Sequence, residues 1–180
     1  MGLWDGRFSR KTAEQVTEFT ASVHYDSRLY PYDIKGSIAH ANMLGKTGII
    51  PQEEAAAIVR ELQNIKSRMD HGDITLRPEL EDIHMNIEAL LTEALGDIGA
   101  KLHSGRSRND QIATDERLFL RSEIDTIVKL IADFQRALVY LARRYEDAIL
   151  PGLTHLQHAQ PVLFAHHLLA HVEMLERDRE

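Results

Sequence analysis

Apolar residues recur at intervals of three and four along most of the chain, whereas the alternating pattern of a half-buried strand is rare. The spacing predicts helices over about residues 11–19, 33–48, 51–72 and 82–95. Pro51 followed by two glutamates favours a helix start, because proline suits the first turn and acids complement the helix dipole. Asp33 is a candidate cap of the second helix. The expected core positions are Ala55, Ile58, Val59, Leu62, Ile65, Ile83, Ile87, Leu90, Leu91 and Ala94.

Beyond Ser107 the apolar residues follow steps of four and three, a period of 3.5 that is typical of long helices packed side by side. This apolar seam comprises Leu120, Ile124, Ile127, Ile131, Phe134, Leu138, Leu141, Tyr145 and Ala148. A helix over 107–149 would extend roughly 60 Å and needs other long helices to cover its seam. Pro151 and Gly152 are expected to end it, and Pro161 is expected to start a second bundle helix that reaches about Arg177.

The pattern as a whole predicts an all-α fold in two parts. Residues 1–105 would form a small N-terminal helical domain, and residues 106–180 would supply the first long helices of an incomplete central bundle. A long seam without enough neighbours in the chain also predicts oligomers rather than a monomer.

Composition excludes several classes of function. The formal net charge of −7 does not provide the broad basic surface of a nucleic-acid-binding protein. The absence of cysteine excludes disulfides and thiolate chemistry. No apolar run reaches the length of a membrane span, and the polar start of the chain does not resemble a signal peptide. We therefore expect a cytoplasmic protein that binds neither nucleic acid nor membrane.

The polar run from His103 to Gln111 is the main candidate binding site for a small anion. Ser107 followed three residues later by Asp110 predicts a capping box at a helix start, where free backbone N–H groups suit a carboxylate or phosphate. Arg106 and Arg108 add planar donors that match carboxylates.

Four stretches of the chain have a specific order and spacing: Leu3–Phe8 (LWDGRF), Glu81–His84 (EDIH), Gly99–Gln111 (GAKLHSGRSRNDQ) and Pro151–Pro161 (PGLTHLQHAQP). Together they resemble argininosuccinate lyases, a family of the fumarase/aspartase superfamily. The third and fourth are long and specific, and the first departs from the family at Asp5, where glycine is usual. The resemblance covers essentially the whole chain but only the front part of the family's sequence. It does not reach the family's Gly-Ser-rich loop, which carries the catalytic serine.

The resemblance implies reversible elimination of argininosuccinate to arginine and fumarate in arginine biosynthesis, without metal or organic cofactor. It implies a homotetramer for the complete enzyme, with active sites built from three subunits. His155 would support the acid–base chemistry, and Ser22, Arg108, Asn109 and Thr154 would bind substrate. Without the serine loop, this chain alone is expected to be inactive.

The residues themselves leave simpler roles open. Thr154 and Gln157 match a capping box, Arg108 could form a surface ion pair, and Asp82 could cap the helix that follows it. Asp82 and His84 are secondary site candidates. Three histidines, His166, His167 and His171, form a weak candidate metal site, although no metal is expected.

Two alternatives to this enzyme remain. One is another lyase of the same superfamily, acting on adenylosuccinate, aspartate or malate. The other is a non-catalytic helical binding or structural protein, comparable to the lens crystallins related to the family. The chain ends at Glu180 within a helical pattern, which favours a truncated copy over a naturally short protein.

Overall fold

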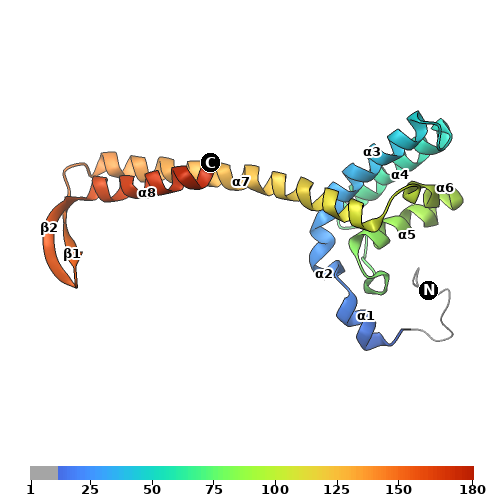
Figure 1. The fold of residues 1–180 in the computed structure, drawn as a ribbon, viewed down its shortest axis with the longest axis horizontal. Coiled ribbons are helices and arrows are strands. Elements are labelled where there is room, and N and C mark those ends of the chain that lie inside the picture. The colour runs from blue at the N-terminus through green and yellow to red at the C-terminus, as the bar shows by residue number, and fades with distance from the viewer. Residues whose placement is uncertain (1–11) are drawn as a thin grey trace. The chain divides into compact units, whose positions relative to one another are not determined.

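The computed structural model describes residues 12–180 and divides into two compact units, one up to Phe119 and one from Leu120 onward (Figure 1). The expected motif Leu3–Phe8 and the expected helix start at Lys11 lie outside the described residues. The division falls inside helix α7 (Arg108–Arg144) rather than at the expected boundary near Gly105. The reason is that Gln111 and Asp115, on the first turns of α7, are buried within the first unit.

The first unit is helical throughout its described part, which agrees with the predicted fold class. Its helices are α1 (Glu14–Thr20), α2 (Val23–Asp26), α3 (Tyr30–Lys46), α4 (Gln52–Asp70), α5 (Ile83–Leu95), α6 (Asp97–Ala100) and the start of α7, and its 3₁₀ turns are η2 (Ser27–Leu29), η3 (Pro78–Leu80) and η4 (Lys101–His103). The core lies among α3, α4 and α5, and its buried side chains include Ile34, Leu44, Ile58, Leu62, Ile65, Ile83, Ile87 and Leu91. These include most of the apolar positions expected from the spacing, although Ala94 is exposed.

Side-chain caps fix two helix starts that carry candidate site residues. The Asp82 carboxylate accepts a hydrogen bond from the Met85 backbone N–H at 2.6 Å and caps α5. At α7 the Ser107 hydroxyl accepts from the Asn109 N–H at 3.2 Å, while the Asp110 carboxylate accepts from the Ser107 N–H at 2.7 Å. The predicted capping box at Ser107 is therefore confirmed.

The prediction that Asp33 caps a helix is wrong. Helix α3 begins three residues earlier, at Tyr30, and the Asp33 side chain is fully buried inside the unit. Its carboxylate faces side chains of α5 and α7 instead of the backbone of its own helix.

The second unit contains a β-hairpin that the apolar spacing did not predict. Strand β1 (Ile149–Thr154) pairs antiparallel with β2 (Gln157–Leu163), and helix α8 (Phe164–Arg179) follows directly. Pro161 lies within β2, so the expectation that it starts a helix is wrong. Thr154 pairs with Gln157 across the hairpin, which excludes the capping-box alternative for these two residues.

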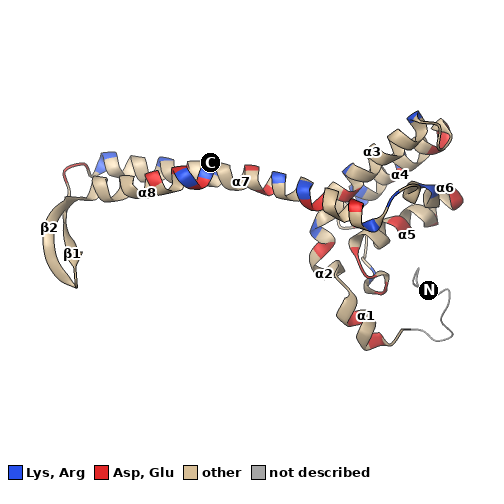
Figure 2. Cartoon of the chain, in the orientation of Figure 1, with Lys and Arg blue, Asp and Glu red and all other residues tan. Residues whose placement is uncertain are grey.

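Most of the apolar seam of α7 is exposed in the second unit. Helix α8 packs on α7 through a small core of Leu138, Ala142 and Leu168. Ile124, Ile127 and Phe134 remain more than half exposed. Basic and acidic side chains are intermixed along α7 beyond Leu120, whereas the hairpin carries neither kind (Figure 2). Among the described residues, no helix is long and apolar enough to cross a membrane.

We expect Gly99→Ala to destabilise the first unit. A Cβ atom at Gly99 would lie 2.6 Å from the Leu91 carbonyl oxygen and 2.9 Å from the Leu91 carbonyl carbon. Because this neighbour is backbone, α6 has to shift away from α5, at a cost of about 1–3 kcal/mol. Urea unfolding of the chain measures the loss. Ala100→Ser, at the exposed neighbouring position, is the control, and an equal effect of both variants would contradict the predicted clash.

Candidate active site

The polar run His103–Gln111 extends from the end of η4 into the first turn of α7 and contacts α3. Gly105 has a φ of 67°, in the left-handed region that glycine adopts without strain, and this turn leads into the capped start of α7. The His40 ring Nε2 lies 3.0 Å from the Ser104 carbonyl oxygen. These contacts attach the segment Ser104–Gln111 to the first unit.

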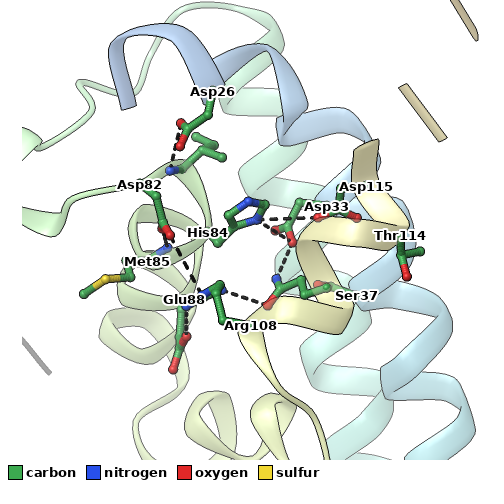
Figure 3. Close-up of polar contacts among 12 residues, drawn as sticks. Asp26, Asp33, Ser37, Asp82, His84, Met85, Glu88, Arg108, Thr114 and Asp115 are labelled. Atoms are coloured by element: carbon green, nitrogen blue, oxygen red, sulfur yellow. Dashed lines mark hydrogen bonds and ion pairs between the residues drawn. The ribbon is translucent and has the colours of Figure 1, made fainter. Parts of the chain in front are cut away.

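Both arginines of this segment already contact carboxylates. The Arg108 guanidinium donates to Glu88 Oε2 at 2.9 Å and to Gln111 Oε1 at 2.8 Å (Figure 3). Arg106 is nearly buried, donates to Ser37 Oγ at 3.3 Å and lies 3.5 Å from Asp110 Oδ1. A substrate carboxylate that binds Arg108 must therefore share or replace its contact with Glu88. Asn109, by contrast, is exposed on the first turn of α7.

Ser22 lies beside the start of α5, where Asp82 caps the helix. The Ser22 hydroxyl donates to Asp26 Oδ2 at 2.6 Å, and Asp26 Oδ1 accepts from the Ile83 N–H at 3.1 Å. The Ser22 N–H also donates to the Glu81 carbonyl at 2.8 Å. Asp82 in turn lies 4.0 Å from Arg108. The structure thus brings Ser22, Asp82 and Arg108 to one region of the first unit.

Glu81, between these elements, has strained backbone. Its φ of 68° is in the left-handed region, which is uncommon for residues other than glycine. Such strain is concentrated at functional sites. It therefore agrees with a functional role for the neighbourhood of Ser22 and Asp82.

Asp33, His84 and Asp115 lie close together next to this region (Figure 3), and with Gln111 they form a buried cluster. His84 Nδ1 is 3.2 Å from Asp33 Oδ1 and 3.5 Å from Asp115 Oδ2. The Gln111 amide donates a hydrogen bond to the same Asp33 oxygen. From the sequence, His84 was a secondary site candidate and Gln111 was part of the candidate polar run. The two aspartates were missed because an acidic residue in a helical pattern is commonly expected to be a cap or a solvent-exposed side chain.

Burial and close charges change the ionisation of this cluster. Burial opposes charge on His84 and Asp33, yet their mutual hydrogen bond and attraction raise the pKa of His84 and lower the pKa of Asp33. Burial and the negative charge of Asp33 raise the pKa of Asp115 to about 7. The cluster therefore gains or loses a proton within the physiological pH range.

The two remaining predicted site residues lie at the tip of the hairpin in the second unit. Thr154 ends β1, and His155 and Leu156 form the two-residue turn. Both turn residues have left-handed backbone, with φ of 49° and 62°, as a tight hairpin turn of this length requires. This conformation usually selects glycine or asparagine, so a histidine here is held under strain. The side chain of His155 is exposed.

The histidines of α8 do not support the candidate metal site. The rings of His167 and His171 lie edge to face with 5.0 Å between their centres. Among the described residues, His166, His167 and His171 do not form a group with the spacing of metal ligands.

The chain is similar to a known protein family and to named relatives. A model of a family described as lyase matches residues 6–180. The chain belongs to this lyase family. It is 53% identical over 178 residues to an argininosuccinate lyase of Pelotomaculum thermopropionicum, covering 99% of the chain and 39% of the relative. It is 56% identical over 177 residues to that of Pseudomonas paraeruginosa, covering 98% and 38%. The chain therefore spans well under half the length of these relatives, and its resemblance to argininosuccinate lyases is confirmed.

Solved structures support the helical fold of this chain. A variant of EDDS lyase with bound fumarate matches with a TM-score of 0.74 and 28% identity, covering 95% of the chain and 34% of that structure. A fumarate lyase from Mesorhizobium sp. BNC1 matches with a TM-score of 0.67 and 26% identity, covering 96% and 40%.

Proposed function

We propose that the chain is the N-terminal portion of an argininosuccinate lyase, which eliminates fumarate from argininosuccinate and releases arginine. The observation that carries the proposal is the level of identity, 53–56% over nearly the whole chain to proteins named argininosuccinate lyase. The structurally similar lyases with other names are 26–28% identical. The motif Gly99–Gln111, which carries much of the resemblance, also forms the capped helix start described above.

In this reaction the chain's residues would hold the substrate and help to move protons. Ser22, Arg108, Asn109 and Thr154 would bind substrate, with donors directed at carboxylates whose charge increases in the transition state. His155 would support acid–base catalysis, the role in which histidine is the side chain most often used. The exposure of His155 at a strained hairpin tip supports this role.

The site is incomplete in this chain alone. The chain corresponds to 38–39% of the relatives' length, and the resemblance does not reach the family's serine-bearing loop. The exposed seam of α7 supports assembly with further long helices, from the rest of the protein or from other subunits, as in a homotetramer. A soluble cytoplasmic location and independence from metals and cofactors belong to the same proposal.

Fumarate release tests the proposal directly. The product of the whole reading frame that encodes this chain is expected to release fumarate from argininosuccinate, measured by ultraviolet absorbance, and not from adenylosuccinate, aspartate or malate. The 180-residue chain is expected to release none. Release from another substrate would identify a different lyase. No release from any of the four, with helical structure intact, would favour a binding or structural protein.

A further inference from the structure

The buried cluster contains more carboxylate oxygen atoms than N–H groups that donate hydrogen bonds to them. The side chains of Asp33 and Asp115 are 1% and 0% exposed. The His84 Nδ1–H and the Gln111 amide both face Asp33 Oδ1. Asp33 Oδ2 and both oxygens of Asp115 have no hydrogen-bond partner among the described residues. Two ionised carboxylates at this depth would leave three acceptor atoms without donors.

An ionised carboxylate without donors is very costly to bury, so one of the two must retain a proton. The ionised form of Asp33 is stabilised by two hydrogen-bond donors, His84 and Gln111. Asp115 has only the longer contact with His84, so its ionised form is less stable. One oxygen of each carboxylate lies within 4.8 Å of the other and of His84 Nδ1. We propose that Asp33 and Asp115 share one proton, carried on Asp115, and that this proton holds the start of α7 and the segment Ser104–Gln111 against α3 and α5.

The surrounding charges agree with this assignment. On α5, His84 is the cation that balances Asp33, and Asp82 adds negative charge near His84. Between η4 and α7, Arg106 partly offsets the repulsion between the carboxylates. The neighbours from α3 and α7, Ser37 and Gln111, are neutral. Burial and Asp33 still raise the pKa of Asp115 to about 7.

A proton fits the cluster better than a divalent cation does. The positive ends of the Gln111 amide and the His84 N–H both point at Asp33 Oδ1 and would repel a cation bound there. The adjoining cavity, between Asp33, His84 and Arg106, has a volume of only about 10 Å³. That volume holds about one water molecule and not a hydrated ion.

The proton makes the attachment of α7 dependent on pH. A carboxyl whose pKa is raised from about 3.9 to about 7 binds a proton in the folded state that the open state releases. The contribution of this proton to the stability of the attachment is complete below about pH 4. It decreases as the pH rises to about 7 and is absent above that pH. The contribution of His84 is likewise lost as the pH rises through its raised pKa. The segment is therefore held most firmly in mildly acidic solution.

Amide hydrogen exchange along the first turns of α7 in the 180-residue chain tests this assignment. After correction for intrinsic exchange, the opening constant is expected to rise by up to roughly 100-fold from pH 5 to pH 7, since one proton gives about tenfold per pH unit. Asp115→Asn, which keeps the shape without the titration, is expected to remove most of this rise. Asp73→Asn, at an exposed position of the same unit, is expected to keep it.

Equal pH dependence of the Asp115→Asn variant and the unmodified chain would overturn the proposal. If that variant does not fold, carbon-13 NMR of the aspartate carboxyls decides in the unmodified chain. A titration near pH 7 supports the shared proton, and full ionisation from pH 5 upward overturns it. A chelator that abolishes the effect would instead indicate a bound cation. Any role of this attachment in substrate binding rests on the proposed function. None of these measurements uses turnover, so a failure of the shared-proton proposal can be distinguished from a failure of the proposed lyase activity.

Discussion

Replacement of His155 by asparagine is expected to lower the turnover of the complete enzyme by about 10²–10⁴-fold, the usual contribution of a positioned acid or base. Asparagine cannot transfer the proton, but it tolerates the left-handed backbone that His155 adopts with a φ of 49°. The His155 side chain is exposed within its unit, so its removal leaves the packing unchanged. The far-ultraviolet circular dichroism signal should therefore stay the same while fumarate release falls.

The matched control is His158→Asn on the neighbouring strand. His158 is also exposed, but it lies in β2, where it pairs with Leu153 of β1, and not in the turn. It is expected to leave turnover within a few-fold of the unmodified enzyme. Unchanged turnover in the His155 variant would remove this residue from the mechanism, and an equal loss in both variants would indicate a structural effect on the hairpin.

The hairpin also shows where sequence patterns were insufficient. Thr154 and Gln157 have the spacing of a capping box, and Pro161 has the position expected of a helix start, so local signals favoured a helix. The paired strands override these signals, because their backbone hydrogen bonds and the two-residue turn cannot be read from side-chain periodicity. The catalytic role that family resemblance implies for His155 stays a prediction, whereas the expected helix around it is wrong.

The first unit was predicted more accurately because its signals are local. The Asp82 cap, the Ser107 capping box and the buried face of α4 each depend on residues within one turn or one helix. The buried cluster depends on residues 33, 84 and 115, which meet only after three helices have packed. No periodicity connects them. A polar residue in the apolar stripe of a helix is the only available signal, and Asp33 was interpreted as a cap for lack of a partner.

Asp33→Ala is expected to cause the largest loss of stability of any single change in this cluster. It removes the acceptor of the His84 N–H and the Gln111 amide, and it leaves the His84 cation buried without its main partner. Breaking a buried ion pair from one side typically costs about 3–5 kcal/mol. Urea unfolding of the chain at pH 6, where the lowered pKa keeps Asp33 ionised and the raised pKa keeps His84 charged, measures the loss.

Asp70→Ala tests whether the loss of stability in the Asp33 variant depends on burial or only on the loss of an ion pair. Asp70 contacts Lys66 at 2.7 Å and accepts a hydrogen bond from the Tyr30 hydroxyl at 2.7 Å, yet its side chain is exposed. Water replaces these contacts when the carboxylate is removed, so the stability should change far less than in the Asp33 variant. Similar losses in the two variants would mean that water reaches Asp33. In that case His84 and Asp115 would also be solvated, and the physical reason for a shared proton would disappear.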